Sequence, residues 1–179
     1  MRKYELTDQT VTTAYGTTLH RIRALRDFGS VKAGDLGGYI QTEGNLGHEG
    51  DCWVYGDARV FGDAEVYDNA WVFGDAQVSG NAEVYGNARV SGNAQVYDNA
   101  WVSGDCWVYG NAQVYGNARV RGNAQVYDNA EVSGNARVYD NAQVYGDAWV
   151  YGDSQVRDNT WVFGEAQLDG VPQQDVWYT

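Results

Sequence analysis

Two histidines, His20 and His48, are the only imidazole side chains in the sequence. Imidazole is the usual general base at neutral pH because its unperturbed pKa lies at about 6.5. His20 falls in a non-repetitive segment and His48 just before the first regular repeat, and a surface or packing role is the simpler interpretation for each. Two histidines cannot supply the three ligands of a three-histidine zinc site. We therefore expect no catalytic residue, no metal-binding residue and no cofactor.

Calcium is the other metal to consider, because Asp and Asn are abundant and their side-chain oxygens are calcium ligands. The acids stand at single positions between short apolar patterns, and they do not form the clustered Asp-x-Asp-x-Asp loop or the nonapeptide repeat that builds an oxygen cage. Gly, Asn and Asp are also the residues that best tolerate positive φ in tight corners. Turn geometry is thus the simpler explanation for the acids.

The pattern that spaces these residues is six residues long. From Val54 a valine recurs every six residues to Val162, and Leu168 closes a series of twenty registers without an insertion. A small residue, nearly always Ala, stands two positions before each valine, and Gly or Asp followed by Asn, Asp or Glu separates the units. Ala and Val therefore share one face of a short strand, and the two variable residues share the other.

Strand and corner alternate in the same order in every unit, so the chain is expected to coil. Three units make a triangular coil of about 18 residues, and successive coils stack as parallel strands about 4.8 Å apart. The predicted fold class is all-β, a single-stranded parallel β-helix with Val54, Val72 and Val90 in one column. Cys52 and Cys106 take the small inward position three coils apart, which is about 14 Å and beyond the reach of a disulfide.

The sequence predicts three segments. They are an N-terminal β-rich cap over residues 1–50, a hexapeptide-repeat β-helix over residues 51–170 and a C-terminal cap or tail over residues 171–179. Residues 4–6 and 17–28 are candidate strands of the cap, which is needed because an open coil exposes unpaired strand edges. At the other end Pro172 cannot extend a ladder, and apolar cover is offered by Val176, Trp177 and Tyr178.

The outward positions carry the variable side chains. Sorting them by eighteen residues gathers four of the seven tryptophans on one side, which we call the aromatic face: Trp53, Tyr55, Trp71, Phe73, Trp107, Tyr109, Tyr127, Tyr145, Trp161 and Phe163. Good β-propensity and stacking along a ladder explain such a row simply. A contact surface is the sharper interpretation, because so many exposed rings exceed the apolar area that a soluble monomer usually leaves bare. We predict these ten residues as the binding or interface residues.

The repeat resembles a known superfamily. Units such as Val54-Tyr55-Gly56-Asp57-Ala58-Arg59 match the aliphatic-x-x-x-small-x rule of the hexapeptide-repeat, LpxA-like proteins. This resemblance implies a left-handed coil, against the general preference for right-handed crossovers. Its best-known members are acyltransferases, which need a catalytic histidine and an acyl-donor groove between neighbouring subunits. Residues 23–28 and 31–40, followed by Asn45-Leu46, also resemble the N-terminal region of uncharacterised YdcK-like bacterial and phage-encoded proteins, which implies a fold and not an activity.

Charge and hydropathy limit the classes of partner that this chain can bind. Residues 51–170 carry seventeen acids against six arginines and no lysine, whereas residues 1–50 carry six of each sign. Such a negative field disfavours nucleic-acid and membrane binding and favours basic partners. The N-terminus lacks the apolar region of a signal peptide and no stretch is long enough to span a membrane, so we expect a cytoplasmic protein.

The function that we predict is a non-catalytic structural or protein-binding β-helix. It is expected to form a homo-oligomer, a dimer or a trimer, or to dock a protein partner through the aromatic face. The alternative from another class is an acyltransferase of the superfamily with an atypical site, for which His48 beside the first coil is the candidate. A second alternative is an acidic DNA mimic or host-factor inhibitor of phage origin, which only the charge supports.

Overall fold

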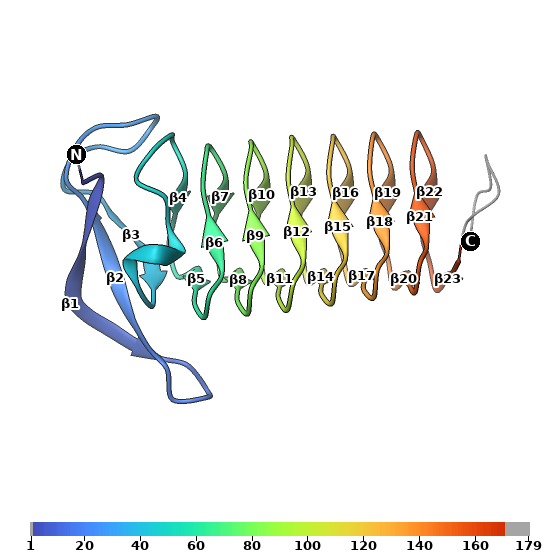
Figure 1. The fold of residues 1–179 in the computed structure, drawn as a ribbon, viewed down its shortest axis with the longest axis horizontal. Coiled ribbons are helices and arrows are strands. Elements are labelled where there is room, and N and C mark those ends of the chain that lie inside the picture. The colour runs from blue at the N-terminus through green and yellow to red at the C-terminus, as the bar shows by residue number, and fades with distance from the viewer. Residues whose placement is uncertain (1, 171–179) are drawn as a thin grey trace.

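The computed structural model describes residues 2–170 as a straight coil of short strands with a β-hairpin at its N-terminal end (Figure 1). Apart from one 3-10 turn, η1 (Glu43–Asn45), the regular elements of this part are strands. The all-β prediction is confirmed. The predicted tail 171–179, with Pro172 and the apolar residues Val176, Trp177 and Tyr178, lies outside the described residues.

Three strands precede the regular coil. β1 (Tyr4–Thr12) pairs antiparallel with β2 (Thr18–Ala24), and β2 pairs antiparallel with β3 (Leu36–Ile40). The predicted strand over residues 17–28 is therefore too long. The chain leaves the sheet after Ala24, where the Asp27 carboxylate accepts hydrogen bonds from the Ala33 amide (2.9 Å) and the Lys32 ammonium (3.1 Å) and folds the segment into a loop.

The coil itself forms three sheets, one for each side of the triangle. The first contains β4 (Trp53–Val54), β7 (Trp71–Val72), β10 (Arg89–Val90), β13 (Trp107–Val108), β16 (Gln125–Val126), β19 (Gln143–Val144) and β22 (Trp161–Val162). The second contains β6 (Glu65–Val66), β9 (Glu83–Val84), β12 (Trp101–Val102), β15 (Arg119–Val120), β18 (Arg137–Val138) and β21 (Gln155–Val156). The third continues β1, β2 and β3 with β5 (Arg59–Val60), β8 (Gln77–Val78), β11 (Gln95–Val96), β14 (Gln113–Val114), β17 (Glu131–Val132), β20 (Trp149–Tyr151) and β23 (Gln167–Asp169).

Every coil strand pairs in parallel with the strand eighteen residues away. Val72 is the register partner of both Val54 and Val90, so the predicted valine column is confirmed. The pairing is made by main-chain bonds such as Trp71 N–H to Ala88 O, at 2.9 Å. The cap joins the third sheet by the same kind of bond, because β3 pairs in parallel with β5, with Tyr39 opposite Arg59.

The interior is filled by the two inward columns of each sheet. The repeat valines and the repeat alanines from Ala58 to Ala148 are fully buried, and burial of each valine contributes about 1.5 to 3 kcal/mol before the entropy of ordering is subtracted. Cys52 and Cys106 occupy alanine positions and are free and buried, as the repeat predicts. Ser154 takes the same position near the last coil, where its hydroxyl donates to the Leu168 carbonyl at 2.8 Å.

The corners carry hydrogen-bonded amide ladders. In one ladder each Nδ2 donates to the Oδ1 one coil further on, through Asn81, Asn99, Asn117, Asn135 and Asp153, at 2.9 to 3.3 Å. A carboxylate accepts but cannot donate, which explains why an Asp ends this ladder. The acids at these positions are thus part of the corner structure. Among residues 2–170, no three His, Cys, Asp or Glu side chains are grouped so as to hold a metal ion.

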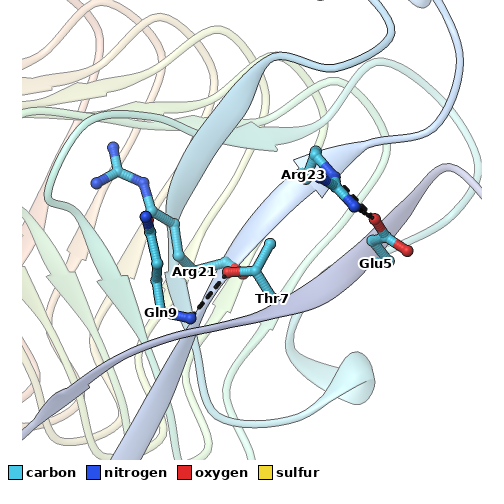
Figure 2. Close-up of polar contacts among 5 residues, drawn as sticks. All are labelled: Glu5, Thr7, Gln9, Arg21 and Arg23. Atoms are coloured by element: carbon cyan, nitrogen blue, oxygen red, sulfur yellow. Dashed lines mark hydrogen bonds and ion pairs between the residues drawn. The ribbon is translucent and has the colours of Figure 1, made fainter.

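The hairpin formed by β1 and β2 projects beyond the outline of the coil (Figure 1). Figure 2 shows its polar face, where Glu5 of β1 forms an ion pair with its register partner Arg23 of β2. Thr7 lies in a bulge of β1; its hydroxyl donates to the Arg21 carbonyl at 2.9 Å and accepts from the Gln9 amide at 3.3 Å (Figure 2). Within the described residues, no helix is long and apolar enough to cross a membrane.

The corner glycines supply the first test of this packing. Gly104 has φ +80, and a Cβ there would lie 2.9 Å from the main-chain N and O of Gly122 in the next coil. Gly56 has φ +61, close to the 59–60 of the corner aspartates, and its nearest neighbour would be 3.6 Å away. We expect Gly56→Ala to cost about 1 kcal/mol for the left-handed backbone alone.

Gly104→Ala adds the close approach of the next coil to the same backbone cost, so it should lower the free energy of unfolding clearly more than Gly56→Ala. Denaturant unfolding of the two variants measures the difference. Equal losses would show that the coils do not approach each other as closely as the glycine positions require.

Candidate binding face

The repeat brings the predicted aromatic residues onto one sheet. Trp53, Trp71, Arg89, Trp107, Gln125, Gln143 and Trp161 are successive register partners along the seven-stranded sheet. The prediction that residues eighteen positions apart lie on the same face of the coil is therefore confirmed. The capacity of this face to bind a partner depends on which of its side chains are exposed.

Trp53 differs from the other members of the aromatic face. Its side chain is 1% exposed, and its ring meets Tyr4 and Phe28 of the cap edge-on at 6.1 and 5.3 Å. Gly37 of β3 lies so close that a Cβ there would be 2.7 Å from the indole. The prediction of an exposed Trp53 is wrong, because the cap covers the start of this face and uses the indole as its anchor.

The next rings surround an arginine. Tyr55 meets Trp71 edge-on at 5.5 Å, and the Arg89 guanidinium lies over the rings of both Trp71 (5.2 Å) and Trp107 (5.0 Å). We call Trp71, Arg89 and Trp107 the indole–guanidinium stack. Within residues 2–170 the Arg89 side chain has no ion pair and no hydrogen bond. Its N–H groups therefore have no protein acceptor within this part of the chain and can donate to a ligand.

Two hollows flank this stack. The polar hollow, of about 550 Å³, lies on the corner side and is lined by Asp51, Asn69, Asn87 and Asp105 as well as the stack. The apolar hollow, of about 350 Å³, lies on the other side and is lined by Ser30, Tyr55 and Phe73 together with Trp71 and Arg89. The cap thus takes part in the face, since Ser30 comes from its loop and its hydroxyl lies 3.2 Å from that of Tyr55.

The C-terminal half of the face is a stacked ladder. Tyr109, Tyr127 and Tyr145 stack at 4.9 Å between ring centroids, and Phe163 follows Tyr145 at 5.3 Å. Stacked rings cover each other's faces and present only their edges. The simple interpretation of the aromatic row, stacking along a strand ladder, therefore fits this half well.

Exposed tryptophans also occur on the other two sides of the coil. Trp107 and Trp161 of the aromatic face are 44% and 38% exposed, and Trp101 and Trp149 of the other sheets are each 37% exposed. Exposure alone does not distinguish the aromatic face. The aromatic face is distinguished by an arginine that lies over two indoles, since on the second sheet Arg119 lies over one indole, that of Trp101, at 4.7 Å. Neither Arg89 nor Ser30 is among the site residues predicted from the sequence.

Comparison with known proteins shows what the repeat is similar to. A family model described as the YdcK β-solenoid repeat matches residues 82–94, 94–110, 112–128, 124–140 and 142–158. Within residues 82–158 the coil is therefore similar to YdcK β-solenoid repeats, and we call it YdcK-type for that similarity.

A curated protein of Escherichia coli K12, named "Uncharacterized acetyltransferase YdcK", is 42% identical over 62 residues. The match covers 31% of this chain and 19% of the relative, so this chain spans about a fifth of the length of that protein. The similarity therefore covers only a part of each protein, and it transfers no activity by itself.

His48, the candidate base beside the YdcK-type coil, is held in a packed position. Its ring stacks on Tyr4 at 4.5 Å, and its Nδ1 accepts the main-chain N–H of Lys3 at 3.2 Å. Burial lowers the pKa of His48; the Glu43 charge opposes this shift, and the Lys3 and Arg2 charges add to it. A neutral ring whose Nδ1 accepts carries its proton on Nε2, so neither nitrogen is free to take a proton from a substrate.

Lys3 and Cys52 meet beneath the cap of the YdcK-type coil. The fully buried Lys3 ammonium lies 3.0 Å from the Cys52 sulfur and 2.9 Å from the Cys52 carbonyl. Burial raises the pKa of the Cys52 thiol, and the Lys3 charge opposes this only in part. Cys52 is thus a neutral packing residue, and burial likewise raises the pKa of Cys106 to about 12.

The tyrosines of the YdcK-type coil give a pH prediction. Burial, with a smaller contribution from neighbouring tyrosines and acids, raises the pKa of Tyr97 and Tyr127 to about 12 from an ordinary value of 10.0. Their neutral form is favoured in the folded state, so the stability they contribute is complete below pH 10 and is lost as the pH rises from 10 to 12.

Replacing Tyr127 with Phe removes one ionisable group of this kind. The loss of stability between pH 10 and pH 12 should be smaller in Tyr127→Phe than in the native chain, and thermal unfolding across this range measures it. At pH 8 the variant loses only the hydroxyl contact to Gln143, at 3.2 Å. Parallel pH profiles for the two proteins would contradict the assignment.

Proposed function

We propose that this chain is a non-catalytic binding protein that docks a protein partner, or a second copy, through the N-terminal half of the aromatic face. The observation that carries the proposal is the indole–guanidinium stack between two hollows. Trp and Arg are the residues most enriched at binding hot spots, because they bring large contact areas and lose little entropy when fixed. A closed dimer or trimer is the commonest way to bury such a face against another copy.

The repeat architecture also supports a binding role. The twenty registers run without an insertion, so the coil has no loop on which catalytic residues could be gathered. The coil contains no histidine, and its acids occupy corner positions. The side chains that vary from coil to coil are the outward ones, and they form continuous surfaces. We keep a cytoplasmic location as a prediction.

Acyl transfer is the second candidate, and the name of the Escherichia coli relative is the observation that favours it. Its test is turnover of acetyl-CoA by the purified chain, compared with the His48→Gln variant. We expect no turnover, since the His48 ring is held by Tyr4 and by the Lys3 amide. Turnover that His48→Gln abolishes would contradict the binding proposal.

Exposed tryptophans on all three sides of the coil allow a matched test of the binding face. Trp71 and Trp107 are replaced with Ser in one variant, and Trp101 and Trp149 in the other. We expect only the first pair to have an effect, which is either a lower mass in solution or weaker partner binding. The loss of affinity should be about 30-fold or more, which corresponds to a hot spot of about 2 kcal/mol.

Sedimentation or light scattering measures the mass, and thermal unfolding checks that both variants fold. None of the four substituted tryptophans belongs to the buried core cluster, so both variants should remain folded. Equal effects from the two pairs would show that the aromatic face has no special role and that its rings serve only to stack along the strands.

A further inference from the structure

The polar hollow is an elongated trough with one carboxylate at each end. Asp51, Asn69, Asn87 and Asp105 occupy the same corner in four successive coils, beside β4, β7, β10 and β13 (Figure 1). Asp51 and Asp105 are three coils apart, about 14 Å. The two amides between them are committed to a ladder in which Asn69 donates to Asn87 (3.3 Å) and Asn87 to Asp105 (2.8 Å).

The two carboxylates of this trough, those of Asp51 and Asp105, are exposed and form no ion pair within the described residues. Arg89 lies midway along the trough, stacked between the two indoles. A ligand that complements the trough therefore places a cation at each end and a hydrogen-bond acceptor, without positive charge, in the middle.

An extended polypeptide offers these groups at the right spacing. Its residues rise by about 3.4 Å each, so side chains at positions i and i+4 are on one edge and about 14 Å apart. Lys or Arg at those two positions reaches Asp51 and Asp105, while a main-chain carbonyl between them accepts from Arg89. The side chain at i+1 points to the opposite edge, where the apolar hollow lies between Tyr55 and Phe73.

We propose that this groove binds an extended basic segment of a partner protein, lying along the coil axis, with cationic residues four positions apart and an apolar residue next to the first. The proposal rests on the binding function above and names the chemistry of the partner. The excess of eleven negative charges over residues 51–170 attracts such a segment from a distance, and the two hollows select its spacing.

The first arm of the test uses two labelled peptides of one composition. In acetyl-Gly-Lys-Leu-Ser-Gly-Lys-Ser-amide the lysines are four positions apart, and in acetyl-Gly-Lys-Lys-Leu-Ser-Gly-Ser-amide they are adjacent. Fluorescence anisotropy at low salt measures their affinity for the full chain. We expect the spaced peptide to bind about fivefold more tightly, and equal affinity would overturn the proposal.

The second arm uses two variants that lose the same charge. Asp51→Asn with Asp105→Asn removes both ends of the trough and leaves an oxygen to accept from Asn87. Asp63→Asn with Asp153→Asn removes two acids from another corner. The spaced peptide should lose about fivefold in affinity on the first variant and little on the second. Equal losses would show binding to the general negative field, which overturns the proposal.

The outcomes separate this inference from the proposed function. If the spaced peptide has no advantage but Trp71→Ser with Trp107→Ser lowers the mass of the protein in solution, a second copy occupies the groove, and only the peptide proposal fails. If the peptide has no advantage and the tryptophan variants change neither mass nor partner binding, both proposals fail.

Discussion

The structure depends on one interaction, the main-chain hydrogen bond between coils, which runs from an N–H group to the carbonyl seventeen residues on and pairs the strands at an offset of eighteen residues. Trp71 N–H bonds to Ala88 O and Phe73 N–H to Val90 O, and the same pair of bonds recurs around the coil. This offset aligns equivalent positions, so valines stack inside, amides stack at the corners and outward side chains form rows. The indole–guanidinium stack follows from it, because Trp71, Arg89 and Trp107 are neighbours only through this register.

The same regularity limits what the coil can do. Corners of Gly or Asp hold the coils close together, as at Gly104, and no loop interrupts the twenty registers of the repeat. Functional groups must then come from outward side chains and from the cap. The face beside β4, β7, β10 and β13 combines both sources, since Ser30 of the cap and Tyr55 of the coil line one hollow. A binding surface is the function that such a scaffold supports most directly.

The features that follow from the six-residue repeat can be predicted from the sequence. The coil, the Val54–Val72–Val90 column, the inward cysteines and the amide ladders all follow from repeated local patterns. Trp53 was misplaced because its burial depends on Tyr4 and Phe28, which belong to a segment without a repeat. Arg89 stands in the tryptophan column of the sequence, but its contact with both rings depends on side-chain conformation. The hollows depend in addition on where the cap loop places Ser30.

The central claim is that this chain acts by contact through one face of the coil. Hydroxyl-radical footprinting tests it most directly, by comparing the oxidation rates of Trp107, Trp101 and Trp149 in dilute purified protein and inside the cells that express it. Trp107 is at least as exposed as the other two in the free chain, at 44% against 37%. The account predicts that Trp107 becomes protected in cells while Trp101 and Trp149 keep their rates. Equal protection of all three, or of none, would contradict it.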